Sequence, residues 1–273
     1  MTDLIPVSYA ELVRSGVHAL RGLGFRFSSA ERGAHTLAAS QAATGLALRA
    51  IRLAQDRIGL RDRPAIGVSE LRAGILRIDA GGRSLLEMAP LLVDALAADA
   101  KRHGRAVLLA ENCPDLPFVV DLAVRSRHLA CAMACLYQSG SQGDATAGGF
   151  VGRGDQLIGG ALTSEAFAMI ASSPVIERFN AGSLVSACDG GRDRVLLLAS
   201  DGDADALAEE PLWPGLFSRS ERQGWQDASR WLGAIEQSIK GEILVDPEDF
   251  AFFTSCVARI WVPTSERSRA QQG

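Results

Sequence analysis

The sequence predicts an α/β fold in which helices cover a mixed β-sheet and a helical segment precedes that sheet. Strand-like and helix-like patterns alternate between residues 75 and 137, which is typical of a mixed or parallel sheet with helices on its faces. A helical pattern occupies most of the first 60 residues. The 273 residues are 47% hydrophobic and 22% charged, which suffices for a large buried core.

The N-terminal segment, residues 1–65, is expected to be helical. Ser28 and Glu31 have the spacing of a capping box, and Gly59 is placed to end the helix that they begin. Gly45 interrupts the run and can mark a break, because glycine weakens a helix interior.

The central segment, residues 66–200, is expected to hold the sheet. Short apolar runs predict its strands, and longer runs with helical periodicity predict its helices. The strands are expected at residues 75–80, 106–111, 129–137, 183–188 and 194–200. The helices are expected at residues 84–104, about 115–127 and 164–170.

The third segment, residues 201–273, starts with an acidic, irregular stretch. A helix is expected around residues 225–240. Asp246 and Pro247 then have the pattern of an N-cap and a first helical residue, since proline lacks the amide hydrogen that is unpaired at that position. A short strand and a polar tail are expected to close the chain.

Composition argues against several classes of function. A net charge of −4 and only 6% aromatic residues give no basic or base-stacking surface for nucleic acids or acidic membranes. No leader pattern or membrane-spanning run is visible, so a cytoplasmic protein is expected. The four histidines lack metal-ligand spacing, so no metal is expected. The cysteines are expected to be reduced and buried: Cys113, Cys131, Cys135, Cys188 and Cys256.

The stretch ENCPD, residues 111–115, is the first candidate site because it joins a predicted strand to a predicted helix. Free amides at helix N-termini attract anions, so such turns collect ligand sites. Two interpretations of Asp115 remain open, an N-cap or a catalytic carboxylate. The glycine-rich stretch at residues 148–160 contains neither a Rossmann nor a P-loop motif, and a mobile or tightly turning loop is expected there.

Taken together, these patterns resemble the type-2 malate/L-lactate dehydrogenase family, which includes ureidoglycolate dehydrogenase and reductases of cyclic imino acids. VSYAELVRSGVHALRGLGF and the helical run after it resemble the family's N-terminus, and LRIDAGGRSLLEMAP to LACAMA resembles its central unit. The tail RIWVPTSERSRA is similar to the family's closing segment. The N-terminal portion is also similar to an uncharacterised bacterial family.

The resemblance implies a non-Rossmann fold, a homodimer, NAD or NADP as cofactor and a small carboxylate substrate. It places the family's first histidine signature on Thr44 and Gly45, and a substrate-binding arginine on Arg49. The loop that carries the second histidine falls on Asn112. Both histidines are therefore absent. The family's cofactor segment corresponds loosely to Gly154, Asp155, Gln156 and Leu157.

Three interpretations follow from this resemblance. The first is an NAD(P)H-dependent reductase of a small 2-oxo acid or cyclic imino acid. In it Arg49 binds the carboxylate, Asn112 orients the reacting group and Asp115 donates the proton. The second is a relative without redox activity that binds a small metabolite or serves as a partner subunit. The third is a non-redox enzyme, such as a lyase, that reuses the pocket.

Overall fold

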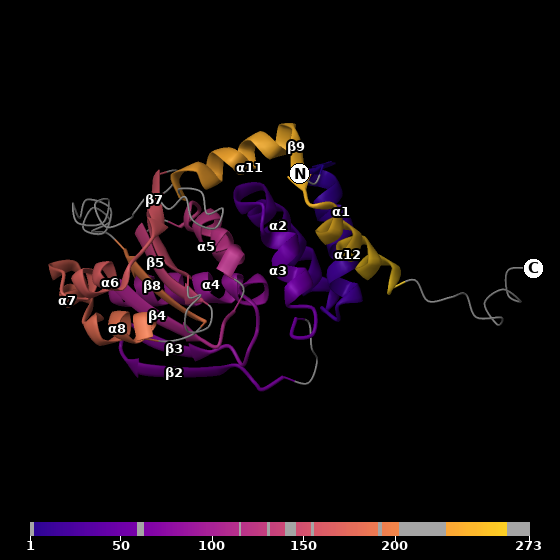
Figure 1. Cartoon of the computed structure of the whole chain (residues 1–273). Coiled ribbons are helices and arrows are strands. Elements are labelled where there is room, and N and C mark those ends of the chain that lie inside the picture. The colour runs from indigo at the N-terminus through magenta and orange to yellow at the C-terminus, as the bar shows by residue number, and fades with distance from the viewer. Residues whose placement is uncertain are drawn as a thin grey trace, which may run out of the picture.

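The fold is built on a seven-stranded sheet, which lies in the left part of the view in Figure 1. The computed structural model describes residues 3–58, 63–114, 116–129, 132–139, 146–153, 156–190, 193–201 and 228–260. The strands of the sheet are β2 (Gly67–Arg72), β3 (Ile75–Asp79), β4 (Arg105–Glu111), β5 (Ala132–Ser139), β6 (Thr146–Arg153), β7 (Gln156–Ala161) and β8 (Arg194–Ser200). Their order is β2-β3-β4-β8-β5-β6-β7, and among these described strands only β3 and β4 are parallel neighbours.

Helices cover both faces of this sheet, which confirms the predicted fold class (Figure 1). The side chains of Ala106 and Leu108 in β4 belong to the larger apolar cluster, whereas those of Val107 and Leu109 belong to the smaller one. Successive strand residues point to opposite faces, so each cluster fills one side of the sheet. The smaller side is covered by α6 (Ser164–Ala171), α7 (Pro174–Phe179) and α8 (Gly182–Gly190). The larger side is covered by α4 (Leu85–His103), the short helix η1 (Leu116–Phe118) and α5 (Val119–Ser126).

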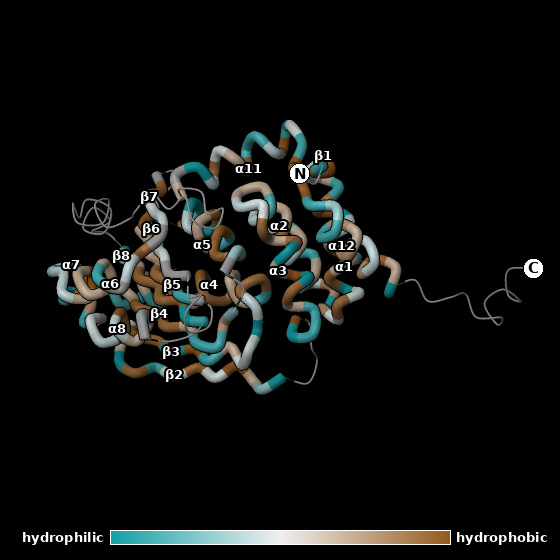
Figure 2. Tube along the Cα trace, in the orientation of Figure 1, coloured by the Kyte–Doolittle hydropathy of each residue, from teal (hydrophilic) through white to brown (hydrophobic). Residues whose placement is uncertain are grey.

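Further helices extend the larger cluster (Figures 1 and 2). They are α1 (Tyr9–Gly22), α2 (Phe27–Thr44), α3 (Ala47–Leu53), η3 (Ala228–Arg230), α11 (Trp231–Lys240) and α12 (Pro247–Ala258). The first strand, β1 (Ile5–Ser8), pairs antiparallel with β9 (Glu242–Val245), and α1 packs against α12. The N-terminal and C-terminal segments are therefore in direct contact.

Several predicted element ends are confirmed, because caps are local features. Ser84 caps α4, and Gly104 ends it in the left-handed conformation that glycine adopts without strain. Gly45 ends α2 in the same way, as its position in the sequence suggested. Asp246 caps α12 through its carboxylate, directly before Pro247.

The strand predicted at residues 183–188 is wrong, because this stretch belongs to α8. A short apolar run fits either a buried strand or a helix by periodicity alone. Here the amides of Leu184 and Val185 both donate to the carbonyl of Ala181, 2.9 Å away, and begin a helix. Val185 is fully buried in the smaller cluster, so packing against the sheet decides the outcome.

The capping box predicted at Ser28 and Glu31 is also wrong. Helix α2 begins earlier, at Phe27, and its N-cap residue Arg26 makes no side-chain cap. Many residues of α2 between Ala30 and Thr44 are buried, and this packing stabilises the helix without a side-chain cap.

Some predictions concern residues that the structure does not describe. Gly59 and the chain from residue 261 onward, with the closing strand and tail, lie outside the described residues. Cys131 and the side chain of Cys188 also lie outside them. The other three cysteines, Cys113, Cys135 and Cys256, are buried as expected.

Candidate functional site

A row of polar side chains crosses four neighbouring strands at one end of the sheet. Asp79 in β3 is in register with Glu111 in β4, and Gln138 in β5 is in register with Arg194 in β8. Glu111 and Arg194 are joined across β4 and β8 by an ion pair. This polar row, Asp79, Glu111, Arg194 and Gln138, lies at the carboxyl ends of the parallel strands β3 and β4, where ligands collect in such sheets.

Glu111 is the centre of the row. Its side chain is buried, and its carboxylate accepts a hydrogen bond from one arginine and forms an ion pair with a second. Arg77 Nε donates to one oxygen, and Arg194 Nη2 lies 2.9 Å from the other. Two guanidinium groups compensate the cost of burying one carboxylate. Next to this ion pair, the Oε1 atom of Gln138 is buried and accepts no hydrogen bond from a described residue.

Asn112 follows β4 and connects it to the end of β3. Its backbone is left-handed, with φ of 54°, and its side chain is exposed. The Nδ2 atom donates to Asp79 Oδ1 at 2.9 Å, and the Gly81 amide donates to the same oxygen at 2.9 Å. The hydrogen bond from Asn112, followed by that from Gly81, lowers the pKa of Asp79, because both bonds favour the charged carboxylate.

Replacing Asn112 with glycine is expected to raise the pKa of Asp79 toward its usual value. Glycine accepts the left-handed backbone, so the change removes the amide without adding strain. A carboxylate with a lowered pKa stabilises the fold above its unfolded-state pKa, and this contribution is lost as pH falls through the folded-state pKa. The stability difference between Asn112→Gly and the parent should therefore shrink in acid.

The measurement is an NMR titration of the Asp79 carboxyl group in both proteins, with urea unfolding at neutral and acidic pH. Asn180→Gly is the matched control. Asn180 also has a left-handed backbone and an exposed side chain, but it lies at the C-terminal end of α7 and makes no hydrogen bond with Asp79. An unchanged Asp79 titration in Asn112→Gly would show that this hydrogen bond does not hold the carboxylate in its charged form.

The remaining residues of the ENCPD stretch fix the turn in place. Cys113 is buried, and its amide donates to the carbonyl of Asp193 at 2.9 Å. The carbonyl of Pro114 accepts from the first amide of α4, that of Leu85, at 3.0 Å. The stretch thus joins β4, β8 and α4. Asp115 lies outside the described residues, so both of its predicted roles stay predictions.

Arg49, the predicted carboxylate-binding residue, lies on α3. This helix packs against η1, which directly follows the ENCPD stretch. Gln41 Oε1 accepts from the Leu48 amide at 3.0 Å and holds the start of α3 against α2. The Arg49 side chain is exposed, and no hydrogen bond or ion pair joins it to a residue that the structure describes. Its guanidinium can therefore bind an anion.

The predicted cofactor segment is only partly described. Gly154 and Asp155 lie outside the described residues, and Gln156 opens β7 opposite Arg153. Leu157 is buried in the larger cluster and faces the protein interior. The assignment of Gly154, Asp155 and Gln156 to a cofactor stays a prediction.

The glycines around this segment form paired strands, where the sequence predicted a loop. A Cβ atom on Gly148 would lie 2.4 Å from the Tyr137 hydroxyl, and one on Gly159 would lie 2.4 Å from the Gly149 carbonyl oxygen. These glycines make room for neighbouring protein atoms. Close strand packing accounts for these glycines without a bound phosphate, and residues 154–155 of the predicted cofactor segment lie outside the described residues.

Within the described ranges, no helix combines the length and the apolar character needed to span a bilayer. No cluster of three or more His, Cys, Asp or Glu residues suited to a metal ion occurs in the part of the chain that the structure describes.

Comparisons with known proteins show the fold. The chain is similar to malate dehydrogenase from Entamoeba histolytica, with a TM-score of 0.63 and 9% identity over 96% of this chain and 99% of that one. It is similar to a putative malate/lactate dehydrogenase from E. coli, with a TM-score of 0.63 and 14% identity over 98% and 99%. A third similar structure is delta1-piperideine-2-carboxylate reductase from Pseudomonas syringae, with a TM-score of 0.56 and 14% identity over 92% and 99%. No family profile matches the sequence, and no curated protein is significantly similar to it.

Proposed function

We propose that this protein is an NAD(P)-dependent oxidoreductase that acts on a small carboxylate-bearing 2-oxo acid or cyclic imino acid. The observation that carries the proposal is the similarity to dehydrogenase and reductase structures over nearly the whole length of both chains. A shared fold alone is an analogy for function. The chemistry therefore has to come from the residues at the carboxyl ends of β3 and β4. A homodimer and a cytoplasmic location stay predictions.

The charges around Asn112 favour an imine over a ketone. Nδ2 of the exposed Asn112 side chain donates to Asp79, and no described residue donates to its Oδ1 atom, which leaves that acceptor available to a ligand. An amide oxygen suits the N–H group of a protonated imine, and the nearby Asp79 carboxylate favours the positive charge. A protonated C=N group also needs no acid to neutralise an oxyanion. Ketone reduction does need one, worth about 10²- to 10⁴-fold in rate.

In this proposal Arg49 binds the substrate carboxylate. The guanidinium is exposed and unpaired among the described residues, and it belongs to the helix that packs against η1. Two parallel N–H groups of arginine match the two oxygens of a carboxylate. Asp115 is proposed as the proton donor for any step that requires one.

The test of cofactor binding is thermal unfolding in the presence of NADH or NADPH. A ligand at 100 times its Kd stabilises the fold by about 2.7 kcal/mol, which raises the Tm of a chain of this size by several degrees. We expect such a shift with one of the two cofactors. If millimolar concentrations of both leave Tm unchanged, the redox proposal is wrong. Binding of a metabolite without redox activity then becomes the better interpretation, since both family histidines are absent.

Substitution of Arg49 by glutamine is expected to raise the KM for the carboxylate substrate about 10- to 100-fold, with a smaller effect on kcat. The measurement is steady-state oxidation of the reduced cofactor with a panel of 2-oxo acids and cyclic imines. Arg14→Gln, at an exposed position on α1, is the matched control and should leave KM unchanged. Equal KM values for Arg49→Gln and Arg14→Gln would remove Arg49 from the site.

A further inference from the structure

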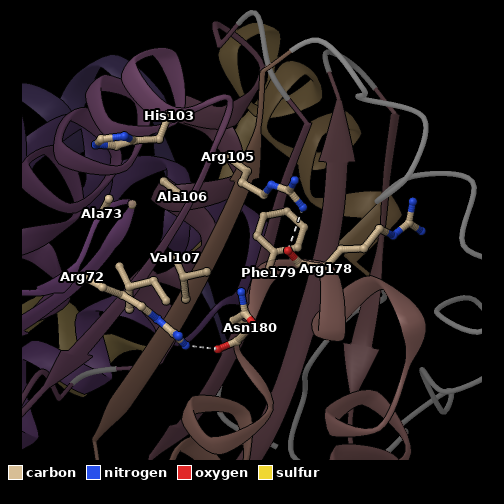
Figure 3. Close-up of a pocket in the computed structure, with 11 residues that line it drawn as sticks. Arg72, Ala73, His103, Arg105, Ala106, Val107, Arg178, Phe179 and Asn180 are labelled. Carbon is tan, nitrogen blue, oxygen red and sulfur yellow. Dashed lines mark hydrogen bonds between the residues drawn. The ribbon is translucent and has the colours of Figure 1, made fainter.

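A cavity of about 330 Å³ opens at the other end of the sheet from Asn112 (Figure 3). It lies where β2 turns into β3, where α4 ends and β4 begins, and where α7 ends. The volume matches the lower range of small-molecule sites. Ile75, Val107 and Phe179 contribute apolar side chains to its lining.

The walls of this cavity carry positive charge. Arg72, Arg105, Arg178 and His103 line it, and none of its lining residues is an aspartate or glutamate. The three arginines form no ion pair with any residue in the described parts of the chain. In a chain with a net charge of −4, a cavity with this lining is a local positive site.

Two of the arginines are held in place by the backbone of α7. Arg72 Nη2 donates to the carbonyl of Asn180 at 2.9 Å, and Arg105 Nη1 donates to the carbonyl of Arg178 at 2.7 Å. Figure 3 shows Arg72 and Arg105 on either side of the backbone that carries these carbonyls, whereas the side chains of His103 and Arg178 extend outward from the rim. Arg72 and Arg105 therefore define the centre of the charge.

These two hydrogen bonds also satisfy carbonyl groups at the C-terminal end of α7. The partial negative charge of a helix C-terminus favours a nearby cation. That role uses one N–H group of each guanidinium. Each guanidinium has five N–H donors, so most donors remain available to a ligand. Because carbonyl contacts already restrict both side chains, a bound anion requires little further ordering of them.

We propose that this cavity binds a small organic anion that carries a phosphate or carboxylate group. The anionic group lies in the cavity near Arg72 and Arg105, and the apolar part of the ligand contacts Val107 and Phe179. The rim charge of Arg178 draws anions toward the opening. The site is separate from Arg49 and Asn112, so it does not depend on the oxidoreductase proposal.

The experiment is isothermal titration of the full-length chain at low salt with inorganic phosphate, pyrophosphate and citrate. We expect saturable 1:1 binding of at least one of them. Preference for pyrophosphate assigns a phosphate-bearing ligand, and preference for citrate assigns a carboxylate. Absence of binding for all three overturns the proposal.

Arg72→Gln and Arg105→Gln are each expected to weaken this binding about tenfold or more, because a charge-assisted hydrogen bond is lost. Arg102→Gln is the matched control, since Arg102 is an exposed arginine near the end of α4 that does not line the cavity. Thermal unfolding shows that each variant is folded. Equal weakening in Arg102→Gln would overturn the proposal, since binding would then reflect net charge. Arg49→Gln should bind the anion as the parent does, whatever its effect on the proposed reaction.

Discussion

Replacing Gly22 with alanine is expected to lower the free energy of unfolding by about 3 kcal/mol, at the upper end of the usual cost of overpacking. Gly22 is the last residue of α1, at its contact with α12. A Cβ atom at this position would lie 1.9 Å from the carbonyl oxygen of Cys256 and 2.9 Å from its carbonyl carbon. Backbone atoms cannot move aside as a flexible side chain can, so the two helices would have to separate.

The matched control is Gly233→Ala in α11. Apart from the neighbouring residues and backbone of α11 itself, nothing in the described part of the chain lies within 4 Å of a Cβ built there, and the position is exposed. Alanine in place of glycine in a helix interior should stabilise the protein by up to about 1 kcal/mol. Urea unfolding of both variants measures the two changes, which should have opposite signs. A Gly22→Ala protein as stable as the parent would mean that α1 and α12 do not pack this closely.

Replacing Glu111 with alanine is expected to destabilise the fold by about 2–3 kcal/mol. The carboxylate is buried, and its removal takes one acceptor from each of two guanidinium groups, although Arg194 keeps the carbonyl of Ala187. Breaking a fully buried ion pair costs about 3–5 kcal/mol. The expected loss is smaller here because the side chain of Arg77 is 53% exposed and can reach water.

The control for this variant is Glu70→Ala on β2, an exposed strand at the edge of the sheet, which should change stability by less than about 0.5 kcal/mol. Combining Glu111→Ala with Arg77→Ala gives a double-mutant cycle, and the loss caused by Glu111→Ala should be smaller in the Arg77→Ala background. Additive losses in the double variant would show that the two side chains do not interact.

The candidate site could be predicted only in part. The resemblance to the dehydrogenase family identified Asn112 and Arg49. The structure places Asn112 in the turn after β4 and Arg49 on α3, which packs against η1. The polar row was missed. Its signal was present, because Asp79 and Glu111 each follow an apolar run and Arg194 precedes one. That pattern alone does not say which strands are neighbours.

The sequence by itself determined the α/β class and the local features: the caps at Ser84 and Asp246 and the helix end at Gly45. Each of these depends on a few consecutive residues, so no distant contact is needed to read it. Only the tertiary structure decided that residues 182–190 are helical, that the glycine-rich stretch pairs as strands, and that Glu111 meets Arg194. These outcomes depend on which distant segments pack together and in which register, and a one-dimensional pattern does not contain that information.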